Sequence, residues 1–548
     1  MPDRSGDAQP DHESGFSLWL WSLLGVFAAA VPCALLVVEK LGSTLSPVPL
    51  TLALLAALAG YVVAVRVVVR ETFGQRTGRS RVLVWLAAGC LFLVSVAVLF
   101  AFRPPPPPLT RMRGARDVAV VGFAGRDEAH DGQVLTDVAA DFARSMTGRI
   151  PTATAVRSYA GEISLPLLEL QGNDQSRLER KTAAFADETN AEIVVGGLVD
   201  TDPAGQTTLR PAVYVRADQV PDSPELAGWY LDGPILMSRS WESARGRAQL
   251  SAELTRQTGT LAEFVDALDT WRNGSPVEAG QILESLLDPR QQNGRDGFVP
   301  LDLIRLFRGH TAEQQAFTET GHNRQTLLEK ARANYLAIRK NSLVGWRARL
   351  SLQGNAYRRA LGQARNCQPG TVHAAELAAI SQALRALAKD PEFTKLGQLK
   401  ATVNLAQVEQ CRITAGLVKD DGTVDEALSA VRASPDIAGA AEIHALAESI
   451  AAVHAAHRGD LAMAVERIRD AIAQGQDLVE RFVWHGLLAS WSLARCDLGT
   501  GRMAQQDAIA QLAAAERTGR VDLTFRRQYE QALAAELHQA EEYCGKMR

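Results

Sequence analysis

Three long apolar stretches without a single charged residue occupy the first fifth of this 548-residue chain. They cover 14–38, 41–65 and 82–102, with lengths of 25, 25 and 21 residues. A helix of about 20 apolar residues is long enough to cross the hydrocarbon core of a bilayer. The sequence therefore predicts a disordered tail over 1–15 and three transmembrane helices within 16–102. The bilayer is then an integral partner, and the protein is expected in the cell membrane as a multi-pass protein.

The positive charges beside these stretches predict the side on which the rest of the chain lies. The short loop between the second and third stretches carries Arg66, Arg70, Arg76, Arg79 and Arg81. Short loops with many arginines stay on the cytoplasmic side. This loop favours a soluble part that lies outside the cytoplasm.

Five consecutive prolines, 104–108, follow the third stretch, and they predict a stiff linker over 103–115. Beyond the linker the chain is acidic. Residues 116–548 carry 48 Lys and Arg against 56 Asp and Glu, whereas the first 115 residues carry ten against six. Because binding to phosphates needs a basic face, we expect no nucleic acid among the partners.

Residues 116–237 alternate short β-type runs with helical patterns. Strands are predicted at 117–123, 192–199 and 209–217, and helices at 135–146 and 175–189. Such alternation is typical of a small α/β domain. Gly122 and Gly125 follow the first strand but complete neither a dinucleotide-binding nor a phosphate-loop motif, so no cofactor is expected.

Three segments of this domain resemble a known family. They are VAVVGFAG at 118–125, ADETNAEIVVGGLVDTD at 186–202 and LRPAVYVRA at 209–217. Together they are similar to the small α/β domain called TolB-like, although 150–175 matches nothing in that pattern. The resemblance implies a non-catalytic module that often lies near a membrane helix and is often followed by helical repeats.

Residues 238–548 are rich in Ala and Leu and contain an internal repeat. A glycine followed five residues later by Ala and nine residues later by a mostly apolar residue occurs at Gly274, Gly422, Gly459 and Gly499. The last three glycines are 37 and 40 residues apart, a period typical of helix–turn–helix repeats. The pattern predicts an all-α solenoid.

Capping patterns support this helical interpretation. The sequence S/T-x-x-E/Q, which is common at helix N-termini, begins at Thr260, Ser275, Thr311 and Thr423. Each of these four positions is predicted to start a helix.

The segment HRGDLAMAVERIRDAI, 457–472, resembles a tetratricopeptide repeat, with Gly459, Ala464 and Ala471 at family positions. The similarity extends in degenerate form over roughly 260–540. It implies a curved stack that binds a peptide or protein segment in its groove. Trp484 and Trp491, seven residues apart on one face of a predicted helix, are the candidate groove residues. Packing in the core is the alternative for both.

The sequence gives little support for a metal site or a catalytic site. His444, Glu448, His454 and His457 lie close together, but without the spacing of a zinc site, so no metal and no catalytic residue is expected. The soluble part contains four cysteines, Cys367, Cys411, Cys496 and Cys544. They can form two disulfides or remain as four free thiols.

These observations together predict a membrane-anchored, non-catalytic scaffold or sensor-accessory protein rather than an enzyme. It would bind a protein or peptide through its tetratricopeptide-like array. The alternative is an enzyme, or a protein that binds a nucleotide or another small molecule in the α/β domain.

Overall fold

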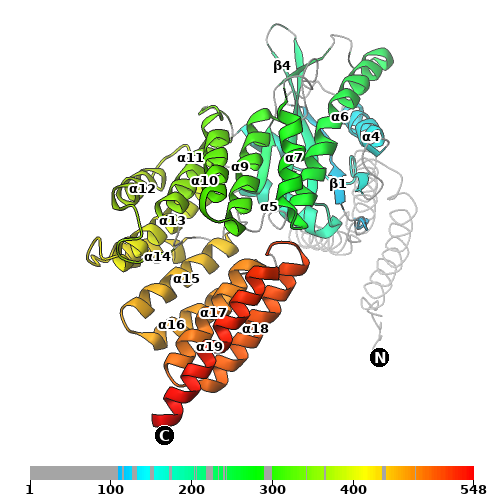
Figure 1. Cartoon of the computed structure of the whole chain (residues 1–548). Coiled ribbons are helices and arrows are strands. Elements are labelled where there is room, and N and C mark those ends of the chain that lie inside the picture. Colours follow the sequence, from blue (N-terminus) through cyan, green and yellow to red (C-terminus); the bar gives the residue numbers. More distant parts are fainter. Residues whose placement is uncertain are drawn as a thin grey trace, which may run out of the picture. The chain divides into compact units, whose positions relative to one another are not determined.

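The computed structural model describes residues 109–547, apart from 114–115, 126–131, 148–153, 172–175, 203, 205, 217–225, 232–233, 238–240, 242, 289–298, 341, 343, 363–365, 435–439, 476 and 522. The described residues belong to one compact unit, Pro108–Arg548. Within it, a small mixed α/β domain precedes a helical region (Figure 1).

The prediction of three transmembrane helices is corrected here. Across the described part of the chain, no helix is both long and apolar enough to span a bilayer. The longest of these helices, Ala244–Arg272 and Leu523–Met547, carry charged residues along their whole length. The stretches at 14–38, 41–65 and 82–102 lie outside the described residues. The described helices therefore do not support the predicted integral bilayer partner or the predicted multi-pass cell-membrane location with its soluble part outside.

Seven strands form one mixed sheet in the order β3–β1–β4–β5–β6, with β2 beside β4 and β7 beside β5. Strands β1, β3 and β4 are parallel, whereas β5 is antiparallel to both β4 and β6. The strands are β1 (Arg116–Val120), β2 (Ala124–Gly125), β3 (Thr154–Ser158), β4 (Ile193–Thr201), β5 (Thr207–Val215), β6 (Gly228–Leu231) and β7 (Ile235–Leu236).

Helices cover both faces of this sheet. Val118 and Val120 of β1 belong to one core cluster with Phe142 of α4 (Gly132–Thr147), and α6 (Ala244–Arg272) packs on α4. Ala119 and Val121 belong to a second cluster with residues of η1 (Leu167–Gln171) and α5 (Ser176–Thr189). Because both faces are buried, residues 118–121 form a continuous apolar run instead of alternating.

The predicted elements of this domain are confirmed. The expected strands correspond to β1, β4 and β5, and the expected helices correspond to α4 and α5. The region 150–175, which matched no pattern, contains β3 and η1. Strand β3 pairs with β1 at the border of the sheet, and its described side chains are only partly buried, so its sequence lacks a strong apolar signal.

From Ala244 onward the described residues fold as a succession of helical hairpins. The hairpins pair α6 with α7, α9 with α10, α11 with α12, α13 with α14, α15 with α16 and α17 with α18, and α19 packs on the last pair. Beyond α6 the helices are α7 (Pro276–Leu287), α9 (Leu301–Thr318), α10 (Gly321–Leu336), α11 (Gly345–Ala360), α12 (Ala374–Leu387), α13 (Lys395–Thr414), α14 (Thr423–Arg432), α15 (Ala441–His457), α16 (Leu461–Gln474), α17 (Leu478–Ala494), α18 (Leu498–Arg517) and α19 (Leu523–Met547).

The turns of these hairpins correct the predicted repeat. Gly274, Gly422 and Gly459 lie in hairpin turns with positive φ angles of 85°, 84° and 84°. The residue in the equivalent turn before α18 is Cys496, with a φ of 58°, whereas Gly499 lies inside α18. Cys496 thus follows Gly459 by 37 residues, and Gly459 follows Gly422, the N-cap residue of α14, by the same interval. The sequence pattern missed this because Gly is the residue expected in a left-handed turn.

Two of the four predicted helix starts are also wrong. Thr260 lies inside α6 and Thr311 inside α9, where the Thr311 hydroxyl donates to the carbonyl of Arg308 at 3.0 Å. In the middle of a helix, Thr can bond to its own backbone, so the capping pattern occurs there too. Ser275 does precede α7, with Pro276 at its first position, and α14 begins at Thr423 after Gly422.

A continuous core joins the sheet to the first hairpins. One cluster of buried residues runs from β1 through α6 and α9 to Ala348 of α11, across the predicted boundary at 238. Arg347 strengthens this junction because its guanidinium donates to the carbonyl of Ala227 at 3.0 Å. The same group lies over the ring of Tyr230, 4.6 Å from the ring centre.

Two distant turns of the helical array are in contact with each other. The α6–α7 turn at Gly274 lies against the α18–α19 turn at Thr518 and Gly519 (Figure 1). Beside this contact, the rings of Phe317 on α9 and Phe525 on α19 lie 6.3 Å apart. The first and last described hairpins are therefore in contact.

Two disulfides resolve the question that the cysteines left open. Cys367 pairs with Cys411, and Cys496 pairs with Cys544, with Cα atoms 5.1 and 5.6 Å apart. The first links the α11–α12 connection to α13, and the second links the turn before α18 to the end of α19.

Candidate functional site: a cavity inside the helical array

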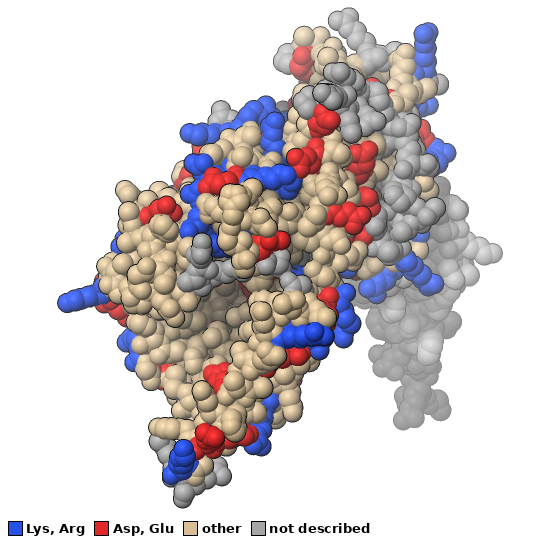
Figure 2. Space-filling view, in the orientation of Figure 1, with Lys and Arg blue, Asp and Glu red and all other residues tan. Residues whose placement is uncertain are grey.

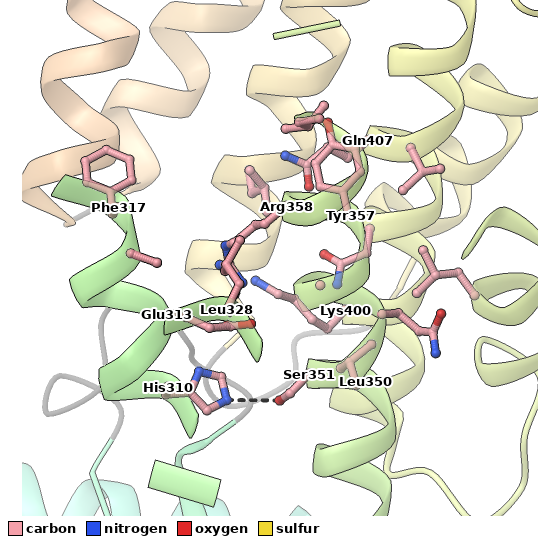
Figure 3. Close-up of a pocket in the computed structure, with 18 of the residues that line it drawn as sticks. His310, Glu313, Phe317, Leu328, Leu350, Ser351, Tyr357, Arg358, Lys400 and Gln407 are labelled. Atoms are coloured by element: carbon pink, nitrogen blue, oxygen red, sulfur yellow. Dashed lines mark hydrogen bonds and ion pairs between the residues drawn. The ribbon is translucent and has the colours of Figure 1, made fainter. Parts of the chain in front are cut away.

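A cavity of about 320 Å³ lies inside the helical array. Its wall comes mainly from α9, α11 and α13, which are the first helices of three successive hairpins (Figure 3). Arg324 and Leu328 of α10, Leu384 of α12 and single side chains from α15 and α17 add to it. A hollow is visible in the middle of the array in the space-filling view (Figure 2).

The lining combines apolar and polar side chains. Leucines and Phe317 supply much of the apolar surface. The polar residues recur at helical spacing along the three first helices, so that one face of each helix is presented to the cavity. They include His310 and Glu313 on α9, Ser351 and Arg358 on α11, and Lys400, Asn404 and Gln407 on α13.

An ion pair links two of these helices at the cavity wall. The Glu313 carboxylate, 4% exposed, lies 2.6 Å from a guanidinium nitrogen of Arg358. A buried carboxylate is stable only when a cation or several donors compensate for its lost hydration. Arg324 of α10 extends the contact, because it donates to the carbonyls of Arg358 and Gly362 at 2.9 Å each.

His310 is held in the wall as a neutral ring. Its Nε2 lies 2.9 Å from the Ser351 hydroxyl, and the residue is buried. Burial, together with the nearby charges of Arg358 and Lys400, lowers the pKa of His310 from 6.5 to about 3. A base with so low a pKa accepts a proton poorly at neutral pH. The contact with Ser351 is therefore better suited to positioning than to activation of a nucleophile.

Tyr357 joins the cavity to a disulfide. Its hydroxyl lies 3.7 Å from the sulfur of Cys367, which is bonded to Cys411 of α13. Burial raises the pKa of Tyr357 to about 12, so the phenol stays protonated. The disulfide thus fixes the helix connection against which this lining side chain rests.

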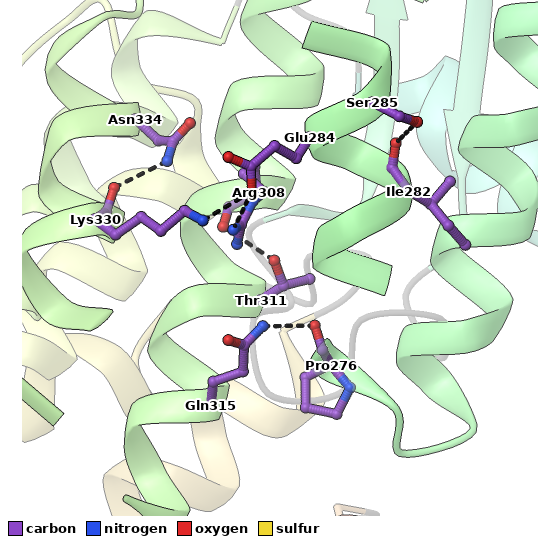
Figure 4. Close-up of polar contacts among 9 residues, drawn as sticks. All are labelled: Pro276, Ile282, Glu284, Ser285, Arg308, Thr311, Gln315, Lys330 and Asn334. Atoms are coloured by element: carbon purple, nitrogen blue, oxygen red, sulfur yellow. Dashed lines mark hydrogen bonds and ion pairs between the residues drawn. The ribbon is translucent and has the colours of Figure 1, made fainter. Parts of the chain in front are cut away.

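A polar cluster outside the cavity holds α9 in place (Figure 4). One oxygen of Glu284 on α7 accepts from Arg308 of α9 at 2.9 Å and from Lys330 of α10 at 2.8 Å. Gln315 of α9 donates to the carbonyl of Pro276 at 2.7 Å. The hydrogen bonds from Lys330 and Arg308 lower the pKa of Glu284. These contacts tie three helices together and so orient the cavity face of α9.

The two tryptophans proposed from sequence lie elsewhere. Trp484 is 4% exposed and belongs to a core cluster with Ile468 and Leu488. Trp491 is partly buried against the same cluster. Neither is among the residues that line the cavity. Both therefore occupy the packing position that the sequence also allowed.

The histidine group is dispersed among separate contacts. His454 is buried and its Nδ1 lies 2.5 Å from the amide oxygen of Gln410, whereas Glu448 pairs with Arg432 at 2.6 Å. Within the described ranges, no three His, Cys, Asp or Glu side chains are grouped as metal ligands.

The glycines of the α/β domain have a packing explanation. A side chain on Gly196 of β4 would meet Leu167 and Val121 at 3.0 and 3.1 Å. A side chain on Gly197 would meet Leu209 and Phe123, both at 3.1 Å. The pair lets neighbouring side chains pack onto the strand. The loop that follows Gly125, from residue 126 to 131, lies outside the described residues.

The cavity residues were not singled out from the sequence, although a signal for them exists. Lys400, Asn404 and Gln407 are spaced at i, i+4 and i+7 within α13, a helix that is otherwise mostly buried. Polar residues repeated at this spacing mark one face of a helix. No family profile matches this chain, and comparison with curated proteins finds no relative.

Proposed function

We propose that this protein is a non-catalytic binding scaffold whose helical array, a degenerate tetratricopeptide-like stack, holds a segment of polypeptide in its cavity. One observation carries the proposal: successive first helices present their polar residues to one shared cavity. In a stack of hairpins, the first helices line an extended surface that suits an elongated ligand. The TolB-like α/β domain would serve as the rigid base of the array.

The chemistry of the lining suits a peptide. Gln353, Asn404 and Gln407 carry amide groups that both donate and accept hydrogen bonds, as the peptide backbone does. Leu350 and Leu446 offer apolar surface for side chains of the ligand. Such a mixture of apolar wall and a few polar groups is typical of binding pockets.

The charged groups of the wall favour binding over catalysis. Glu313 is paired with Arg358, and the low pKa of His310 makes it a weak general base. The cavity lies in the helical array, which favours the array as the binding element over an enzyme or small-molecule function in the α/β domain.

The proposal is tested by selecting random displayed peptides on the immobilised full-length protein. Peptides enriched on the wild type are then measured by calorimetry against two variants. Asn404→Trp places a large side chain in the cavity, whereas Met503→Trp places one on α18 at a residue that is 60% exposed and outside the lining. We expect N404W to weaken binding at least tenfold, which is about 1.4 kcal/mol, and M503W to leave it unchanged. Equal affinities of N404W and the wild type would show that the cavity is not the site, and the absence of any enriched peptide would refute the function.

A further inference from the structure

The contact between the first and last described hairpins has the geometry of a closure. Gly274 and Gly519 both have positive φ angles, 85° and 69°, and their backbones meet directly. A methyl group built on Gly274 would fall on the carbonyl oxygen of Thr518. A methyl group on Gly519 would lie 2.8 Å from the carbonyl oxygen of Gly274. The two backbones can come this close only because both positions are glycine.

The amide hydrogen bonds of these glycines are local to each turn. The Gly274 N–H donates to Trp271 at 3.0 Å, and the Gly519 N–H donates to Glu516 at 2.9 Å. Each turn therefore keeps its own backbone hydrogen bonds when the two separate. Neighbouring hairpins within the array, by contrast, share apolar core clusters along their helices.

Phe317 connects the closure to the cavity. Phe317 lines the cavity, is 43% exposed, and contacts the ring of Phe525 on α19. Phe525 in turn lies 6.1 Å from the ring of Phe482 on α17. Movement of α19 away from α9 would uncover Phe317 and widen the cavity at this side.

We propose that the Gly274–Gly519 contact, with Phe317 and Phe525, is a latch that holds the array closed around its cavity, and that release of the latch opens the cavity to larger molecules. The inference rests on the proposed function only in taking this cavity as the binding site. Two glycine turns and one pair of rings form a small interface, and small interfaces with few buried apolar contacts open first.

The array provides a matched control for breaking the latch. Gly459 occupies an equivalent hairpin turn with a φ of 84°, and a methyl group built on it meets nothing within 4 Å. Gly274→Ala and Gly459→Ala therefore impose the same left-handed strain, but only G274A pushes the two turns apart. Phe525→Ala weakens the aromatic part of the latch without altering a left-handed residue, so it serves if G274A does not fold.

Accessibility of the cavity measures the latch without any ligand. Asn404→Cys, in full-length protein with Cys33→Ser and Cys90→Ser, places a single free thiol in the cavity. The rates of its reaction with N-ethylmaleimide and with a maleimide carrying a long polyethylene glycol chain are compared. Met503→Cys on α18 corrects for intrinsic reactivity. We expect G274A and F525A to raise the ratio of the bulky to the small reagent several-fold, whereas G459A leaves it at the wild-type value.

The outcomes separate the latch from the proposed function. Equal ratios in G274A, F525A, G459A and the wild type would overturn the latch, and so would equal ratios in F525A and the wild type when G274A does not fold, whatever the peptide selection shows. A raised ratio in G274A or F525A supports it even when no peptide is enriched, and in that case only the proposed function fails.

Discussion

Cys496 repeats the left-handed turn of Gly459, 37 residues further along the chain, with a φ of 58° against 84°. A non-glycine residue in this conformation is strained by about 1 kcal/mol or more. Cys496 also carries one end of a disulfide to Cys544 at the end of α19. The turn thus accepts local strain in a position where glycine recurs, and gains a covalent link to the last helix.

Two replacements of Cys496, by Ser and by Gly, are therefore expected to differ in their effect on the free energy of unfolding. Loss of the disulfide in Cys496→Ser/Cys544→Ser should lower the free energy of unfolding by about 2–4 kcal/mol. In Cys496→Gly/Cys544→Ser the disulfide is equally absent, but the turn strain is relieved, so this variant should be about 1 kcal/mol more stable than the first. Urea unfolding of both variants checks the difference. Equal stabilities would mean that the turn is not strained.

Arg347 is expected to contribute more to the free energy of unfolding than Arg349, which lies on the same helix. Arg347→Met removes the hydrogen bond to Ala227 and the contact with Tyr230, and should cost about 2 kcal/mol. Arg349→Met, two residues away, removes partly exposed ion pairs with Asp390 and Glu392 and a contact with the ring of Phe393, and should cost about 1 kcal/mol. Thermal unfolding ranks the two, and hydrogen exchange should show faster exchange at β6 in R347M alone. A larger loss in R349M would contradict this role of Arg347.

His310 predicts that stability falls in acid. Its folded pKa of about 3 is below its ordinary value of 6.5, so the stability that its neutral form contributes is complete above pH 6.5 and is lost as the pH falls towards 3. At pH 4 the loss should reach about 3 kcal/mol. His310→Gln should flatten the pH dependence of unfolding between pH 7 and 4. Parallel curves for H310Q and the wild type would show that His310 is not the group responsible.

The lowered pKa of Glu284 predicts a smaller loss of stability as the pH falls. Because Lys330 and Arg308 lower its pKa from 4.5, its contribution is present above that value and disappears as the pH falls through the lowered pKa. The side chain is 58% exposed, so Glu284→Gln should cost only about 0.5 kcal/mol at pH 7 and less at high salt. Glu466→Gln, an exposed acid in the middle of α16, is the control and should change nothing. A cost that persists below pH 3 would mean that the effect is not electrostatic.

Much of the fold was predictable from local patterns. The apolar run of β1 and the spacing of apolar residues in α4 identify these elements because burial of one strand or one helical face depends on residues that are close in sequence. The hairpin period was predicted for the same reason, and its single error arose where Cys496 replaces a turn glycine. The transmembrane interpretation of 14–102 found no support in the described helices, and the choice of Trp484 and Trp491 missed the cavity.

By itself, the amino-acid sequence determined strands β1, β4 and β5, helices α4 and α5 and the helical character of the rest, since those outcomes depend on contacts a few residues apart. Only the tertiary structure decided that Glu313 faces Arg358, that Cys367 pairs with Cys411, and that Gly274 meets Gly519. Each of these contacts joins residues more than 40 positions apart. Their positions follow from the summed packing angles of every hairpin between them, and no local pattern in the chain encodes that sum.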